Sequence, residues 1–219
     1  MPDVSRAAFT AARDHASSDF DVRHSLSGAF TYRIPAATRN GIPALVTKDW
    51  ALDFVIVART GFPFNGVVLS TSPDPGGYAT SRPDLVPSQP VWLYGSQCLA
   101  VDGPPCAGGK GLNPAAFAVP PTIRQGTEGR NDIAGFGLTQ VDLSLSRKIR
   151  MTGRLDLEFR ADAFNVLNHP NFTNPQAYIE FGPFYLQSQQ MLNQSLGGLN
   201  PLFQEGGPRS LQLSLKLAF

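Results

Sequence analysis

The last nine residues of the sequence, LQLSLKLAF, constrain the fold more than any other stretch. Apolar side chains alternate there with polar or small ones, and the apolar positions are Leu211, Leu213, Leu215, Leu217 and Phe219. A period of two is typical of a β-strand with one apolar face. A strand of an outer-membrane barrel has this pattern because one face meets lipid and the other a polar lumen. An edge strand of a soluble sandwich alternates in the same way, so these residues alone leave both structures open.

Four earlier segments alternate similarly, which predicts an all-β chain. In the first of them the even-numbered positions are apolar apart from His24, and in the second the alternation is weaker. The third and fourth are joined by a tight turn at Thr152-Gly153, which predicts an antiparallel hairpin. The expected strands are about 20–34, 46–60, 138–149, 154–167 and 209–219.

The connections between these strands alternate strictly in length. Two are short, at about 36–45 and 150–153, and two are long, at 61–135 and 168–207. The long ones are rich in Pro, Gly and Asn, and structureless connections of that length are uncommon in compact domains. Transmembrane barrels combine short periplasmic turns with long outer loops. The sequence therefore predicts an antiparallel transmembrane β-barrel segment of about five strands, a partial barrel with long extracellular loops.

Several aromatic residues have two interpretations. Tyr32 and Trp50, near the ends of neighbouring strands, fit either the aromatic girdle of a membrane interface or core packing. The second long connection holds four more, which fit either packing of that connection onto its neighbours or contact with a ligand: Tyr178, Phe181, Phe184 and Tyr185.

Composition narrows the class of protein. The formal net charge of +1 provides no basic surface for nucleic acid. Charged residues make up 16% of the chain, below the roughly 25% of soluble domains. No window approaches the ~18 apolar residues of a transmembrane helix. The first twenty residues have no apolar core of the signal-peptide kind, so an export signal is expected outside the given sequence.

The two cysteines, Cys98 and Cys106, lie in a stretch rich in Pro and Gly. In an oxidising compartment they fit a small disulfide loop, and two free thiols are the alternative. Without histidines nearby, the pair is a poor metal site.

No catalytic constellation is recognisable in the sequence. His15, His24 and His169 are scattered, and neither a GxSxG motif nor a P-loop occurs. Three carboxylates share one face of the fourth strand, where a charged lumen explains them better than acid–base catalysis; they are Asp156, Glu158 and Asp162. We therefore expect no enzymatic activity, no cofactor and no metal.

The residues from Phe159 to Pro175, FRADAFNVLNHPNFTNP, carry the most specific motif. This segment resembles the C-terminal region of Oar-like TonB-dependent outer-membrane receptors of the acidobacterial type. Other pieces fit in the same order, among them RTGFPFN at 59–65, GRNDIAGFG at 129–137 and QVDLSLSRKI at 140–149. The resemblance covers nearly the whole chain.

The resemblance implies a barrel of about 22 strands with a plug inside it, and uptake of a scarce nutrient such as an oligosaccharide, metal chelate or peptide. No residue here matches the plug or the TonB-contacting motif, so the chain is expected to be the C-terminal piece of such a receptor. Its partners would be outer-membrane lipid and the barrel-assembly machinery, which recognises a terminal strand like 211–219. A surface-binding or adhesion protein and a soluble β-sandwich binding module are the alternatives.

Overall fold

The computed structural model describes residues 15–37, 41–71, 78–99, 109–122, 124–153, 155–192 and 206–219. The chain divides into two compact units. The sheet unit comprises His24–Arg59, Gly137–Asn171 and Met191–Phe219. The connection unit comprises Met1–Arg23, Thr60–Phe136 and Phe172–Gln190.

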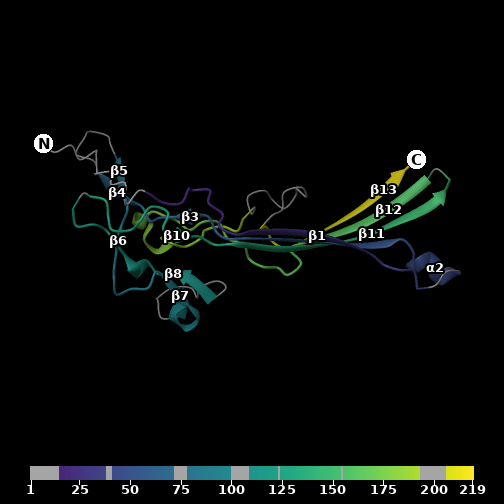
Figure 1. The fold of residues 1–219 in the computed structure, drawn as a ribbon, viewed down its shortest axis with the longest axis horizontal. Coiled ribbons are helices and arrows are strands. Elements are labelled where there is room, and N and C mark those ends of the chain that lie inside the picture. The colour runs from purple at the N-terminus through teal and green to yellow at the C-terminus, as the bar shows by residue number, and fades with distance from the viewer. Residues whose placement is uncertain are drawn as a thin grey trace. The chain divides into compact units, whose positions relative to one another are not determined.

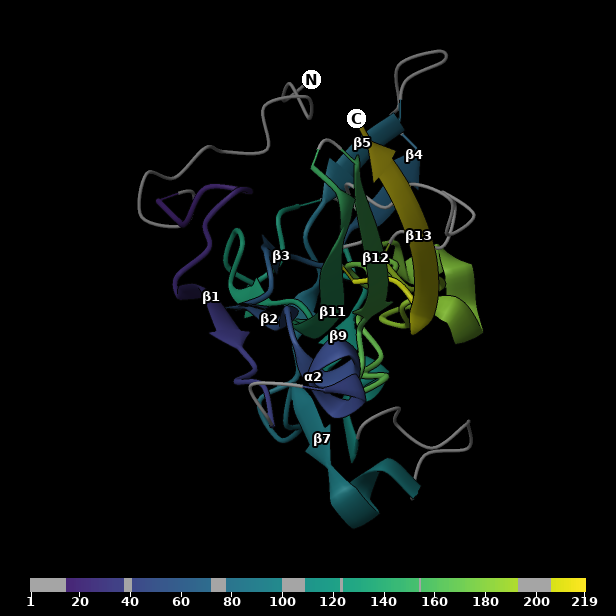
Figure 2. The same cartoon turned by 90° about the vertical axis from the view of Figure 1, so that its right-hand side faces the viewer.

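The sheet unit is built on one antiparallel five-stranded sheet. Figure 1 shows its strands running beside one another, and Figure 2 shows β11, β12 and β13 as adjacent arrows. Their order is β1-β2-β11-β12-β13, and the sheet is open, so the predicted fold class, a partial all-β barrel segment, is confirmed. The strands are β1 (Ser25–Arg33), β2 (Trp50–Arg59), β11 (Leu138–Thr152), β12 (Leu155–Phe164) and β13 (Ser210–Ala218).

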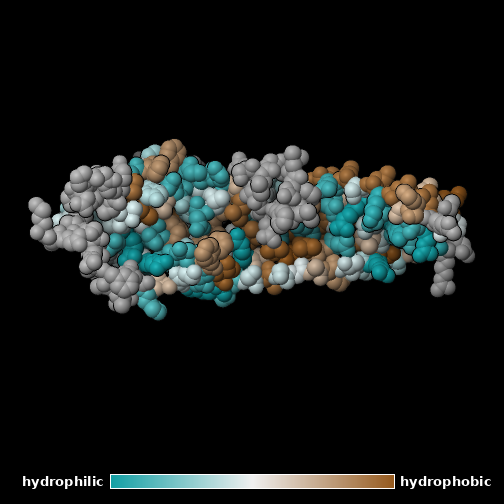
Figure 3. Space-filling model, turned by 90° about the horizontal axis from the view of Figure 1, so that it is seen from above, coloured by the Kyte–Doolittle hydropathy of each residue, from teal (hydrophilic) through white to brown (hydrophobic). Residues whose placement is uncertain are grey.

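The register places the apolar positions of all five strands on one face. One row across the sheet consists of Phe30, Phe54, Leu143, Ala163 and Leu211, each opposite the next. Directly opposite residues in an antiparallel pair point to the same face, so the alternation of each strand adds up to one continuous apolar surface. In Figure 3, hydrophobic residues gather along one side of the sheet-bearing part of the molecule.

The two ends of the sheet differ in the connections that leave them. Arg33 lies opposite Ala51 at one end, from which the short connections 34–49 and 153–154 leave. Ser25 lies opposite Arg59 at the other end, from which residues 60–137 and 165–209 leave. Short and long connections are therefore sorted to opposite ends, as in transmembrane barrels.

Two strand starts differ by four or five residues from the sequence-based expectation, and the third and fourth strands end at Thr152 and Phe164 rather than at 149 and 167. The second strand begins at Trp50 rather than at 46, because the preceding residues form the short helix α2 (Ile42–Thr47). The indole Nε1 of Trp50 donates to the carbonyl of Val46 at 2.8 Å, and Asp49 turns the chain with a φ of 64°. The first strand begins at Ser25 rather than at 20, because a turn closed by Asp21 N–H and the Ser18 carbonyl precedes it.

In the described residues of the connection unit all helices and strands are short, as its Pro- and Gly-rich sequence predicts. Four two-stranded ladders pair β3 with β10, β4 with β5, β6 with β9 and β7 with β8. The elements are β3 (Pro63–Phe64), β4 (Val68–Thr71), β5 (Tyr78–Ser81), β6 (Asp84–Leu85), β7 (Trp92–Tyr94), η1 (Gly95–Leu99), β8 (Lys110–Leu112), η3 (Pro114–Ala116), β9 (Phe117–Ala118), β10 (Ile133–Ala134) and η4 (Ile179–Phe184).

A small hydrophobic cluster holds the connection unit together. It buries Phe64, Leu112, Ala116, Phe117, Ile133, Tyr185 and Leu186. These residues come from both long connections, so the two are packed against each other within the unit. Among the residues described above, no helix is both long and apolar enough to cross a membrane.

Candidate functional site

The apolar face of the sheet is exposed along its two edge strands, and the strands have the length that a membrane requires. β1 and β13 have nine residues each and β2 and β12 have ten, which matches the roughly 9–11 residues of a tilted transmembrane strand. Leu211, Leu213, Leu215 and Leu217 are each more than half exposed, and so is Phe30 on β1. A soluble sandwich would seal such side chains within its core, so the soluble alternative does not fit this face.

The opposite face of the sheet carries charges that are paired with one another. The guanidinium of Arg160 lies between two carboxylates, with Nε 2.8 Å from Asp162 Oδ1 and Nη1 3.9 Å from Asp53 Oδ2. Lys148 Nζ lies 2.8 Å from Asp156 Oδ2. Placing a charge in hydrocarbon has a high free-energy cost, whereas charges are tolerated on the hydrated inner wall of a barrel. The two faces therefore provide what a barrel wall requires on its two sides.

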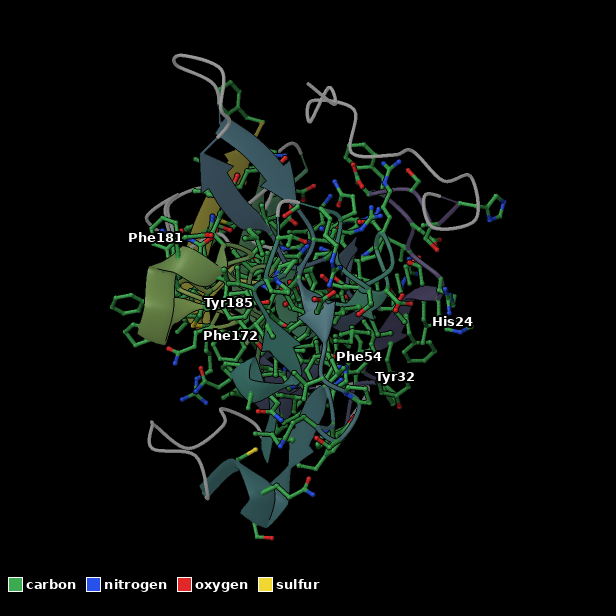
Figure 4. All side chains as sticks on the ribbon, turned by 90° about the vertical axis from the view of Figure 1, so that its left-hand side faces the viewer. His24, Tyr32, Phe54, Phe172, Phe181 and Tyr185 are labelled. Atoms are coloured by element: carbon green, nitrogen blue, oxygen red, sulfur yellow. The ribbon has the colours of Figure 1, made fainter. Side chains whose placement is uncertain are left out.

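Aromatic and basic side chains meet on the apolar face at its short-connection end. Trp50 and Phe159 make an edge-to-face contact with ring centroids 6.5 Å apart. The guanidinium of Arg147 lies 5.4 Å from the Trp50 ring, and its Nε donates to the carbonyl of Lys48 at 3.2 Å. Tyr32, nearby on β1, is half exposed (Figure 4). Aromatic rings and snorkelling cations are typical of the membrane–water boundary, which favours the girdle interpretation of Tyr32 and Trp50.

Residues 165–171, part of the specific motif, end β12 and tie it to its neighbours. Asn165 has a φ of 47°, which stops the strand, and its side-chain Nδ2 donates to the carbonyls of Gly207 at 2.8 Å and His169 at 2.9 Å. Asn171 is fully buried, and its Oδ1 accepts from Thr139 N–H at 2.8 Å. Buried amides thus fix the path of the chain where it leaves β12.

Two residues of β11 extend these contacts. The side-chain Nε2 of Gln140 donates to Asp142 Oδ1 at 2.8 Å, and its Oε1 accepts from Gly206 N–H at 2.6 Å. Asp142 Oδ1 also accepts from Asn165 N–H at 2.8 Å. We refer to Gln140, Asp142, Asn165 and Asn171 as the amide network. Alternation along the strands does not reveal this network, and its signal in the sequence is the density of asparagines in 165–171.

The expected assembly signal lies on β13, an edge strand that pairs with β12. Its four leucines lie on the apolar face, and Phe219 follows the strand with 99% of its surface exposed. The role of these residues in assembly stays a prediction. Cys98 is disulfide-bonded, but Cys106 lies outside the described residues, so the Cys98–Cys106 pairing stays a prediction.

The aromatic residues of the second long connection divide between the two interpretations. Tyr185 is 2% exposed and packs edge-on against Phe117 at 5.9 Å. Phe181 contacts the ring of Tyr178 at 6.1 Å but remains 50% exposed, and Phe184 is exposed to a similar extent. Figure 4 shows Phe181 on the outer side of η4 and Tyr185 further inside. Packing explains Tyr185, and the exposed pair remains available for contacts.

The three histidines do not form a site. His15 belongs to the connection unit, whereas His24 and His169 belong to the sheet unit, where His169 Nδ1 lies 3.2 Å from Asn171 Oδ1. Within the described ranges, no group of three or more His, Cys, Asp or Glu side chains is arranged to hold a metal ion.

One carboxylate of the connection unit, that of Glu128, is fully buried, and no sequence pattern predicts this burial. Both oxygens of Glu128 accept from Gly66 N–H, at 2.9 and 3.0 Å. A Cβ on Gly66 would lie 2.7 Å from the Tyr185 hydroxyl and 2.8 Å from Pro83 Cγ, so only glycine fits this approach. Burial raises the pKa of Glu128 to about 7; the Gly66 hydrogen bond opposes this shift and the nearby Asp132 adds to it.

The raised pKa of Glu128 predicts a pH-dependent connection unit. The carboxyl of Glu128 keeps its proton up to about pH 7 in the folded unit, whereas it loses the proton near pH 4.5 in the unfolded chain. Protonation therefore stabilises the folded unit. This stabilisation is fully present below about pH 4.5 and is lost as the pH rises through about 7. Its size is on the order of 3 kcal/mol. Hydrogen exchange at 61–67, corrected for intrinsic rates, should accelerate across this window in the natural protein and stay flat in Glu128→Gln. Asp132→Asn should move the transition to lower pH, and a flat profile in the natural protein would contradict the prediction.

An open antiparallel sheet with an exposed apolar face, a charged opposite face and connections sorted by length defines the wall of an outer-membrane β-barrel. The chain matches the family model described as outer membrane beta barrel domain over residues 4–212. It belongs to this family, and its location is therefore the outer membrane. Searches of curated proteins and of solved structures found no match.

Proposed function

We propose that the chain is the C-terminal barrel region of an Oar-like TonB-dependent receptor that takes up a scarce nutrient. The observation that carries this proposal is the charge-paired face around Arg160, which fits the inner wall of a water-filled passage. The motif from Phe159 to Pro175 supports the same assignment. Oligosaccharides, metal chelates and peptides are the candidate ligands, and the protein acts by binding and transport rather than by catalysis.

In this proposal the long connections face the outside of the cell and make first contact with the ligand. Among the described side chains of the second connection, the half-exposed rings of Phe181 and Phe184 suit such contact. No residue among 1–219 matches the TonB-contacting motif, so coupling to TonB would be carried by another part of the receptor. The terminal strand, with Phe219, would be read by the barrel-assembly machinery through strand addition.

Uptake measurements test the proposal. Strains lacking this protein, lacking TonB, or lacking both should accumulate less of one ligand class, and the double deletion should be no worse than either single one. A panel of labelled oligosaccharides, metal chelates and peptides identifies that class. Ligand binding to the cell surface with unchanged uptake would instead favour the alternative, a surface-binding or adhesion protein without transport.

A further inference from the structure

The apolar pattern of β13 does not define a single register against β12. A slip by one residue would turn every leucine to the polar face and is excluded. A slip by two residues keeps the faces correct. Leu211 lies opposite Ala163 and Leu213 opposite Ala161, so a slip by two toward the short-connection end again places Leu211 opposite an alanine.

The polar face excludes only one of the two such slips. Lys216 lies opposite Glu158. Moving β13 toward the long-connection end would place Lys216 opposite Arg160, and like charges opposite each other are unfavourable. Moving it toward the short-connection end would place Lys216 opposite Asp156, which keeps an attractive pair. One wrong register therefore satisfies both the apolar pattern and the charges.

The amide network distinguishes that register from the native one. Asn165 Nδ2 binds the carbonyl of Gly207 at 2.8 Å, and Gly206 N–H binds Gln140 Oε1 at 2.6 Å. A slip by two residues moves the strand by about 7 Å, far beyond hydrogen-bonding distance. Asn165 and Gln140 are 1% and 3% exposed. The slip would therefore break the hydrogen bonds that these two buried side chains make with Gly206 and Gly207.

We infer that the amide network selects the register of the terminal strand among those that its repeating leucines allow. Asn165 and Gln140 hold the segment that leads into β13, while Asp142 orients both by accepting from Asn165 N–H and from Gln140 Nε2. Asn171 anchors the start of β11 through Thr139 N–H. This role does not depend on transport, so its test can fail while the proposed function stands.

Disulfide trapping in the outer membrane tests the inference, with Cys98 and Cys106 replaced by serine. The pair Ala163→Cys and Leu211→Cys reports the native register, and Ala161→Cys with Leu211→Cys reports the slipped one. Opposite positions suit a disulfide, whereas Cα atoms more than about 7 Å apart do not. With the network intact, we expect the native pair to cross-link and the slipped pair to remain at background.

Asn165→Ala should raise the yield of the disulfide that reports the slipped register at least about fivefold, and it should lower the yield of the disulfide that reports the native register. Gln140→Leu removes the hydrogen bond to Gly206 N–H and should change both disulfide yields in the same directions. Asn174→Ala, at an exposed asparagine of the connection unit, is the matched control and should change neither. Retention of the native cross-link alone in both network variants would overturn the inference. Failure of both variants to reach the membrane would overturn it too, because the network would then serve folding rather than register.

Discussion

Leu213→Arg should strongly destabilise the protein in lipid. Leu213 lies near the middle of β13 on the apolar face, opposite the small Ala161 and largely exposed. An arginine on the lipid-facing side of a barrel costs about 2–4 kcal/mol at the bilayer midplane. The free energy of unfolding from lipid vesicles, measured by denaturant titration, should fall by about that amount.

The matched control for this substitution is its neighbour in sequence. Gln212 lies on the polar face, opposite Asp162, so Gln212→Arg adds the same charge to the hydrated side, next to a carboxylate. We expect its unfolding free energy to stay within about 0.5 kcal/mol of the natural protein. Equal losses in both variants would show that the two faces of β13 do not differ in environment, and the assignment of the lipid-facing surface would fail.

Phe219→Ala should lower the amount of folded protein in the outer membrane, probing assembly rather than stability. The ring of Phe219 is fully exposed beyond β13, so it is free to contact a partner that adds its own strand to this edge. Burying a phenylalanine side chain contributes about 1.5–3 kcal/mol, which corresponds to a change of about tenfold or more in binding. Quantitative blotting of membrane fractions measures the effect.

Phe219→Tyr keeps the aromatic ring and serves as the control for assembly. Its level in the membrane should match that of the natural protein. If Phe219→Ala also assembles at the natural level, Phe219 is not part of the signal, and the proposed role of the terminal strand would be restricted to its leucines.

The strands were largely predictable from the sequence because alternation is a local property. In β13 the polarity of each side chain indicates the face on which it lies. The hairpin between β11 and β12 is recognisable from the tight turn at Thr152-Gly153. Helix α2 was missed because its sequence, IPALVT, contains a proline and β-branched residues and is shorter than two turns. Local contacts, such as the hydrogen bond from the Trp50 indole to the Val46 carbonyl, stabilise it where propensity is weak.

The candidate site was less predictable because its contacts are distant in sequence. Asn165 reaches Gly207 across 42 residues, and Gly206 reaches Gln140 across 66. Glu128 lies in a Gly-rich stretch that also holds Asp132, and its burial depends on the approach of Gly66, which is 62 residues away in sequence. Periodicity carries no information about such pairs, whereas the two faces of the sheet follow from it directly.

The directions of the two edge strands determine whether an odd or an even number of further strands can close the barrel. β1 and β13 both run from the end with the long connections to the end with the short ones. Any antiparallel neighbour of either edge must run the opposite way, so identical copies inserted in the same orientation would meet through a parallel pair. Bacterial barrels contain an even number of antiparallel strands. Completing a cylinder around these five therefore requires an odd number of additional strands.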